Sequence, residues 1–173
     1  QGKLTVSFPR TVGQVPIFYN HKNTGRPEGF YESVFITKYL DSPNQPLFPF
    51  GYGLSYTTFE YSEIQMEDKQ LTRDGKLNVS VKVKNTGKYK GTETVQLYIR
   101  DLVASVTRPV KELKSFRKVE LKPGEEKKVE FVITEKDLRF WNDKKQFISE
   151  PGKFHLFIGT DSENVKKAEF VLL

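Results

Sequence analysis

The chain has 173 residues, of which 36% are hydrophobic and 13% aromatic, enough for one packed domain and a piece of another. It contains no Cys, which excludes disulfide bonds and thiolate metal sites. The formal net charge is +6, but most positive charges are lysines that alternate with apolar residues or stand in turns. This pattern is typical of solvated strand faces, so no nucleic-acid partner is expected.

No apolar run approaches the roughly 18 residues that a membrane span needs, so no membrane partner is expected. No segment of the printed sequence resembles a signal peptide. The chain begins at Gln1 rather than at Met, and we expect it to be an excised fragment or a processed product.

Residues 1–50 show little regular periodicity. The opening GKLTVSFP alternates with period two and predicts one strand, with Leu4, Val6 and Phe8 on one face. Further on, YESVFITKYL at residues 31–40 is compatible with a short helical or extended piece. Because a segment with one strand cannot build a core of its own, we expect its apolar side chains to be buried by something outside this chain.

The stretch PLFPFGYGLSYTTFEY, residues 46–61, combines prolines, glycines and aromatic rings as no other segment does. Its GYGLSY begins like a phosphate-binding glycine loop, but Tyr56 stands where the third glycine is needed, so that function is not expected. Either the rings form a platform that stacks on sugars, or they anchor a connector between two bodies. Proline keeps such a chain extended and glycine lets it bend, which favours the anchor. The rings are Phe48, Phe50, Tyr52 and Tyr56.

From residue 57 onward, apolar residues recur with period two. In KLNVSVKVKN, Val81 and Val83 would face a core while Lys82 and Lys84 face water. The runs TETVQLYIRD, KKVEFVIT, GKFHLFIGT and KAEFVLL behave alike, and turn signals such as KPGEE and EPGK separate them. No long helical pattern is present. The sequence therefore predicts an all-β fold, an immunoglobulin-like antiparallel β-sandwich preceded by a mostly irregular N-terminal segment.

The inward-facing residues of these runs define a predicted core. Its members are Leu77, Val79, Val81, Val83, Val95, Leu97, Ile99, Val129, Phe131, Ile133, Phe154, Leu156, Phe170 and Leu172.

The residues that carry chemistry do not gather into a catalytic motif. The carboxylates of Glu67, Asp68, Glu125, Glu126 and Asp137 stand in or beside turns, where we expect them to be solvated. The two His residues are far apart and have no metal-ligand spacing, so no metal site is expected. No nucleophile elbow of the G-x-S-x-G type occurs.

Two ring-bearing positions allow a functional as well as a structural interpretation. His155 alternates out of the core face, so we expect it at the surface rather than as a ligand. Trp141 stands beside Phe140 in LRFWND and could stack on a sugar ring. In a sandwich a tryptophan more often fills the edge of the core, and we expect that here.

Several motifs resemble one known family. LFPFGYGLSYTTFEYS resembles the junction between the α/β-sandwich domain and the fibronectin type III-like domain of family 3 glycoside hydrolases, the β-glucosidases and their relatives. Upstream, GKLTVSFPRTVGQVPIFYNHKNTGRP is similar to the last strand of that α/β-sandwich domain and the loop after it. Downstream, NTGKYKGTETVQLYIRD and EPGKFHLFIGTDS are similar to the fibronectin type III-like domain. The resemblance spans essentially the whole chain.

The resemblance implies an organisation and a role. Residues 1–50 would be a remnant of the α/β-sandwich domain with the connector, and residues 51–173 the fibronectin type III-like β-sandwich. The parent would hydrolyse terminal non-reducing β-linked sugars with retention and without a cofactor, in the periplasm or outside the cell. The family's catalytic aspartate and glutamate lie upstream and match no position here, so we expect the fragment alone to be inactive. Its role would be to pack on the catalytic domains and stabilise them.

The loop YNHKNTGRP would leave the last strand of the α/β-sandwich domain. Its donors Asn20, Lys22 and Arg26 could reach the parent's sugar cleft, or Arg26 could pair with a carboxylate and only fix the loop. Two other roles stay open. An independent carbohydrate- or surface-binding module would need a row of exposed aromatic residues on one face. A homo-oligomer would pair two copies through the apolar residues of the N-terminal segment.

Overall fold

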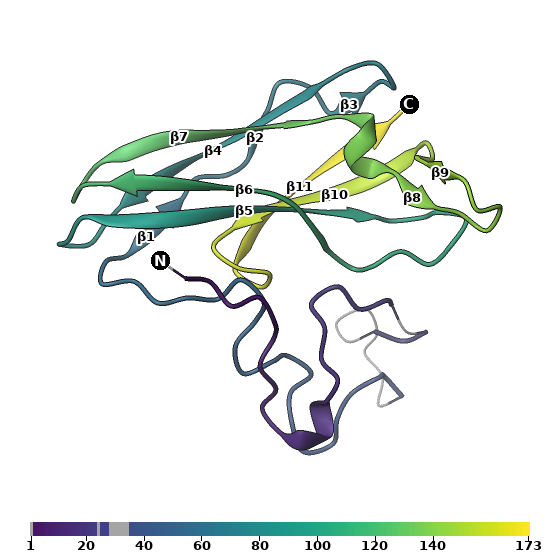
Figure 1. Cartoon of the computed structure of the whole chain (residues 1–173), viewed down its shortest axis with the longest axis horizontal. Coiled ribbons are helices and arrows are strands. Elements are labelled where there is room, and N and C mark those ends of the chain that lie inside the picture. The colour runs from purple at the N-terminus through teal and green to yellow at the C-terminus, as the bar shows by residue number, and fades with distance from the viewer. Residues whose placement is uncertain (1, 24, 28–34) are drawn as a thin grey trace.

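The computed structural model describes residues 2–23, 25–27 and 35–173, and it shows a β-sandwich with the N-terminal segment extending away from one of the sheets (Figure 1). The predicted all-β sandwich is confirmed. Helix within the described residues is limited to two 3₁₀ turns, η1 (Val12–Gln14) and η2 (Glu135–Leu138). None of the described helices has the length and apolarity to cross a bilayer.

The first sheet is built around β4 (Leu77–Asn85). One edge of β4 pairs with β7 (Glu126–Ile133) over a long antiparallel register. Its other edge pairs with β1 (Phe59–Tyr61) near its end and with β2 (Gln65–Met66) near its start. The connector therefore enters the sandwich directly as an edge strand.

The second sheet has the order β3-β11-β10-β5-β6. Its antiparallel strands are β11 (Val165–Leu172), β10 (Gly152–Gly159), β5 (Gly91–Asp101) and β6 (Glu112–Leu121). The two-residue β3 (Gln70–Leu71) pairs with β11 in parallel, which the predicted antiparallel arrangement did not include.

The core lies between the two sheets. All fourteen residues predicted from the alternation are buried in one cluster, so this prediction is confirmed. Within it, the rings of Phe154 and Phe170 stack with centroids 5.3 Å apart. Fully burying one such apolar side chain contributes about 1.5–3 kcal/mol. Four further members of the cluster are Leu71, Leu121, Leu138 and Ile158.

A short hairpin closes one end of the sandwich. It consists of β8 (Phe140–Trp141) and β9 (Phe147–Ile148), which pair antiparallel (Figure 1). At its base, Phe140 is buried beneath the Arg108 guanidinium, 4.4 Å from the ring centroid.

Residues 2–9 do not form the predicted strand. Phe8 makes a single antiparallel bridge with Phe48, and the Leu4 N–H donates to the Tyr52 carbonyl at 2.8 Å. The neighbouring segment in this chain is the connector, whose backbone hydrogen bonds to residues 2–9 cluster around Leu4 and Phe8, so that a single bridge forms instead of a continuous ladder. Val6 and Phe8 remain 58% and 45% exposed.

The short element expected at residues 31–40 is tested only in part. Residues 31–34 lie outside the described residues, and residues 35–40 contain bends without helix or strand. The chain after these residues is held instead by the buried side chain of Gln14, which belongs to η1. Its amide donates to the carbonyl oxygens of Pro43 at 2.8 Å and Gln45 at 3.3 Å.

Candidate functional site

The connector meets the sandwich at an aromatic cluster on the outer face of β5. The Phe50 ring stacks on Tyr19 with centroids 4.1 Å apart. Both rings lie edge-on to the fully buried Tyr98, at 6.5 Å from Phe50 and 5.9 Å from Tyr19. Because Tyr19 covers a face of Phe50, this ring supports the anchor interpretation and not a free sugar platform.

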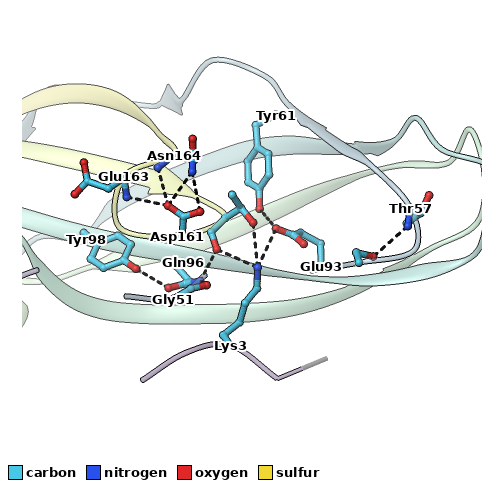
Figure 2. Close-up of polar contacts among 12 residues, drawn as sticks. Lys3, Gly51, Thr57, Tyr61, Glu93, Gln96, Tyr98, Asp161, Glu163 and Asn164 are labelled. Atoms are coloured by element: carbon cyan, nitrogen blue, oxygen red, sulfur yellow. Dashed lines mark hydrogen bonds and ion pairs between the residues drawn. The ribbon is translucent and has the colours of Figure 1, made fainter. Parts of the chain in front are cut away.

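Gln96 of β5 binds the connector next to these rings (Figure 2). Its buried amide nitrogen donates to the carbonyl oxygens of Gly51 at 3.1 Å and Thr160 at 2.6 Å. Its amide oxygen accepts a hydrogen bond of 2.5 Å from the Tyr98 hydroxyl. Gly51 has φ +80°, and a Cβ there would overlap the Gln96 amide. Glycine is therefore required at this bend both for the backbone and for the close approach.

An ionic cluster ties the start of the chain to the same place (Figure 2). Lys3 Nζ donates to the Thr160 carbonyl oxygen at 3.1 Å and to its hydroxyl at 3.0 Å, and lies 4.0 Å from Glu93 Oε1. The Tyr61 hydroxyl of β1 donates to that carboxylate oxygen at 2.8 Å. Burial, followed by the Glu93 charge, raises the pKa of Tyr61, so its hydroxyl stays a donor. Residues distant in sequence thus share one buried carboxylate.

The turn between β10 and β11 is held by Asp161. Its carboxylate accepts the backbone N–H of Glu163 at 2.9 Å and of Asn164 at 2.8 Å. This fixes the turn so that the Ser162 N–H donates to the Phe50 carbonyl oxygen at 2.9 Å. The sandwich therefore grips the connector through backbone groups as well as side chains.

The junction is suited to holding two parts of the chain together rather than to catalysis. Glu93 and Asp161 are 4% and 2% exposed, and their carboxylates already accept hydrogen bonds from neighbouring donors. A retaining glycosidase needs two carboxyl groups that face a substrate. Within the described residues, no group of three or more His, Asp or Glu side chains is placed to hold a metal ion.

Another buried carboxylate lies at the far end of β5. Asp101 is 8% exposed, and its Oδ1 accepts the Val103 N–H at 3.2 Å. Burial raises the pKa of Asp101 to about 6, against the smaller opposing effects of the Val103 hydrogen bond and of Arg108. Arg108 itself pairs with Glu112 at 2.7 Å. Burial in the folded state therefore favours the protonated form of Asp101.

The three donors expected near a sugar cleft lie on an exposed loop. Asn20 and Lys22 are exposed, and the loop is attached to the β5–β6 connection by a bridge between Lys22 and Pro109. Arg26 is also exposed, and its guanidinium donates to the Phe35 carbonyl oxygen at 3.4 Å. The structure thus places the three residues on one loop without bringing them together around a cavity.

A groove of about 660 Å³ adjoins this loop. His21 and Asn23, which flank Lys22 in sequence, contribute to its lining, and Glu163 reaches it from the β10–β11 turn. None of the three expected donors lines it. The sequence contained no periodic signal for this groove because irregular segments form most of it.

The predictions for His155 and Trp141 have different outcomes. His155 lies on the outer face of β10, as the alternation predicts, with Nε2 3.0 Å from Glu169 Oε1. Trp141 does not fill the edge of the core. Its side chain is 66% exposed and packs only against its cross-strand partner Phe147 among the ring contacts of the described residues, with centroids 5.4 Å apart. Phe140, its neighbour, takes the buried position instead.

The buried polar residues of β5 were not expected from the sequence. One signal for them exists: the outward positions of β5 carry Thr94, Gln96 and Tyr98, whereas those of β4 carry Lys82 and Lys84. A stretch of strand whose outward positions carry no charge, as at these three positions before Arg100, is typically covered on both sides. The N-terminal segment provides that cover.

The fold and the junction define a class of protein, a fibronectin type III-like β-sandwich joined to a connector. Residues 93–162 match the family model described as Fibronectin type III-like domain. A protein named periplasmic β-glucosidase from Salmonella typhimurium is 51% identical over 99% of this chain and 23% of its own length. A β-glucosidase of Bacteroides ovatus is 44% identical over 95% of this chain and 23% of its own.

Solved structures of β-glucosidases agree with these sequence similarities. The crystal structure of a β-glucosidase from Listeria innocua in complex with glucose is 44% identical and superposes with a TM-score of 0.89, over 99% of this chain and 24% of that one. This chain therefore corresponds to the C-terminal portion of a family 3 glycoside hydrolase of the β-glucosidase type, including its fibronectin type III-like domain. It spans about a quarter of the length of these relatives.

Proposed function

We propose that this chain is the C-terminal accessory region of a retaining β-glycosidase, and that it packs on and stabilises the catalytic domains upstream. The observation that carries the proposal is the apolar surface of the N-terminal segment. Contiguous exposed apolar surface on a soluble protein typically marks an interaction site. Its most exposed members within the described residues, between 58% and 99% exposed, are Val6, Val12, Val15, Phe18, Phe35 and Leu40, and Leu54 and Tyr56 of the adjoining connector are also exposed.

The junction explains how such a surface would act on the whole protein. Lys3, Gln96 and Glu93 hold the segment against the second sheet through buried contacts. The segment and the sandwich thus form one unit, and whatever covers the apolar residues is joined to the sandwich. In this proposal residues 1–50 are the remnant of the α/β-sandwich domain with the connector, and residues 51–173 are the sandwich.

The activity of the parent is part of the proposal. The names of the relatives support hydrolysis of β-glucosides, and the resemblance to the family implies that the sugar released is terminal and non-reducing. The name of the Salmonella typhimurium protein supports a periplasmic or extracellular location. The chain by itself is not expected to hydrolyse glycosides, since no residue in it matches the family's catalytic carboxylates. Asn20, Lys22 and Arg26 are proposed to face the parent's sugar cleft, because their loop is exposed yet held in place by the His21 carbonyl, which accepts the Val110 N–H at 2.9 Å.

A chimera tests the accessory role. This chain would replace the matching segment of the Salmonella typhimurium relative, and hydrolysis of p-nitrophenyl β-glucoside would be compared for the relative, the chimera and the relative lacking the segment. We expect the chimera to be active, the truncated relative to be insoluble or inactive, and the isolated chain to be inactive. Full activity and unchanged thermal stability of the truncated relative would refute the proposal.

A surface variant makes the test specific for docking. Val12 is 88% exposed, so Val12→Asp should leave the melting temperature of the isolated chain unchanged while lowering that of the chimera. Val132→Asp, on the outer face of β7 and 55% exposed, is the matched control and should change neither. Equal melting temperatures of the Val12→Asp and Val132→Asp chimeras would contradict docking through the N-terminal segment.

A further inference from the structure

The β8–β9 hairpin carries an exposed aromatic pair that the accessory role does not use. Trp141 and Phe147 are direct cross-strand partners on its outward face, 66% and 49% exposed. Tryptophan is on average a highly buried residue, so such exposure is informative. In Figure 1 the hairpin lies at one end of the sandwich, while the N-terminal segment leaves from another side. The pair is thus separate from the surface proposed to dock on the catalytic domains.

Hydrogen bonds across the hairpin hold the backbone that carries the two rings. Its turn is closed by the Asn142 N–H donating to the Gln146 carbonyl oxygen at 3.0 Å, and by the Gln146 N–H donating to Asn142 Oδ1 at 2.9 Å. Lys145 takes the left-handed conformation, with φ 58°, that the turn needs. Rings held in this way do not have to be ordered when a ligand binds.

The base of the hairpin is anchored to the sandwich on both strands. Phe140 is 3% exposed beneath Arg108, and Ser149, directly after β9, is 2% exposed and donates to Glu135 Oε1 at 2.6 Å. Glu135 in turn binds Arg139, directly before β8, at 2.9 Å. Because the buried residues hold the backbone, the outward positions are not needed for packing.

The size of the pair distinguishes between kinds of partner. Aromatic side chains present roughly 150–250 Å² each when fully accessible, so these two rings expose about 260 Å². A stable protein interface buries about 800 Å² on each side. No other large hydrophobic residue of the hairpin is strongly exposed within the described chain. The patch is too small for a protein partner and matches one or two sugar rings.

The surrounding chemistry also fits a sugar. A β-linked glucose or xylose ring has its hydroxyl groups around the rim, and its faces are rich in C–H bonds. Aromatic rings pack on such faces, and neighbouring amides bind the rim hydroxyls. Asn142 and Gln146 are the sequence neighbours of the two rings; Asn142 is half-buried and Gln146 exposed, and their amides share a long hydrogen bond of 3.4 Å. Water can replace this weak contact, and so can a sugar hydroxyl.

We propose that the exposed rings of Trp141 and Phe147 form a surface binding site for pyranose rings of β-linked saccharides. The site needs neither the upstream domains nor their activity.

The experiment uses Trp141 as its own reporter, because it is the one tryptophan of the chain. Cellopentaose would be titrated into the full 173-residue chain while tryptophan emission and acrylamide quenching are followed. We expect a blue shift and reduced quenching that saturate in the millimolar range, about the affinity of a small rigid patch. The α-linked maltopentaose, whose chain is curved, should produce at least about a tenfold weaker response. No change in emission up to about 10 mM cellopentaose would overturn the proposal.

Variants would be compared by native electrophoresis in gels that contain hydroxyethylcellulose. Wild type and Trp141→Phe should be retarded, whereas Trp141→Ala should migrate as in a gel without polysaccharide. Tyr89→Ala, which removes another exposed ring at 64% exposure, is the matched control and should be retarded like wild type. Circular dichroism checks that each variant is folded. Equal retardation of Trp141→Ala and wild type would overturn the proposal. So would a blue shift that appears on concentrating the chain without sugar, since the pair would then be a contact between copies.

Discussion

Replacing Gln96 by Leu tests whether the junction holds the connector through buried hydrogen bonds. The side chain makes three such bonds, to the Gly51 and Thr160 carbonyl oxygens and from the Tyr98 hydroxyl. Thr160 keeps a second donor in Lys3. Leucine would therefore leave two buried groups unpaired, the Gly51 carbonyl and the Tyr98 hydroxyl.

An unpaired buried polar group costs about 1–3 kcal/mol. Two such groups, less the gain from the apolar surface of leucine, should lower the free energy of unfolding by about 3 kcal/mol. For a chain of this length that corresponds to a melting temperature lower by about 6–12 °C. The connector should also become accessible to protease, because the bend at Gly51 loses its side-chain partner.

Urea unfolding monitored by circular dichroism measures the change, with Gln70→Leu as control because Gln70 is exposed. The double variant Gln96→Leu/Tyr98→Phe removes one of the two unpaired groups and should recover about 1 kcal/mol. A Gln96→Leu protein within about 0.5 kcal/mol of wild type would refute the reasoning, since only surface substitutions are normally that mild. A double variant less stable than Gln96→Leu would contradict the role given to the Tyr98 hydroxyl.

Two other predictions concern the sandwich. Val81→Asp should prevent folding, because an unpaired charge in the core costs several kcal/mol. The control Val132→Asp lies on the outer face and should still fold. An unchanged melting temperature for Val81→Asp would remove Val81 from the core. Asp101 has a folded-state pKa of about 6, above its ordinary value near 3.8, so the folded state binds the proton more tightly than the unfolded state. The contribution of Asp101 to the free energy of unfolding therefore falls as the pH rises from about 4 to 6. The free energy of unfolding of Asp101→Asn, measured by urea titration at each pH, should therefore increase relative to that of wild type across this range. A difference between the two proteins that does not depend on pH would contradict the link between Asp101 protonation and folding.

The sandwich core was predictable because its pattern is local. In β4 and β7 one face meets the core and the other meets water, so apolar and polar residues alternate, and Val81 or Phe131 can be assigned without knowing the partner strand. The same rule placed His155 on an outer face.

The errors arose where the surroundings of a residue came from distant parts of the chain. The opening residues alternate like a strand, but their backbone hydrogen bonds to the distant connector cluster around Leu4 and Phe8, so no continuous ladder forms. Trp141 was expected at the core edge, yet Phe140 next to it occupies the position under Arg108. Which of two adjacent rings is buried depends on how the hairpin lies on the sandwich, and no local pattern contains that information.

The sequence by itself determined the all-β class, the core and the family to which its motifs are similar, since these follow from alternation and from short contiguous motifs. Only the tertiary structure decided that Lys3, Gly51, Gln96 and Thr160 meet. It also decided that the outer face of β5 is covered and that the Trp141–Phe147 pair is exposed. The physical reason is that burial and hydrogen bonding depend on which segments fold against one another, and the partners here are separated by up to 157 residues.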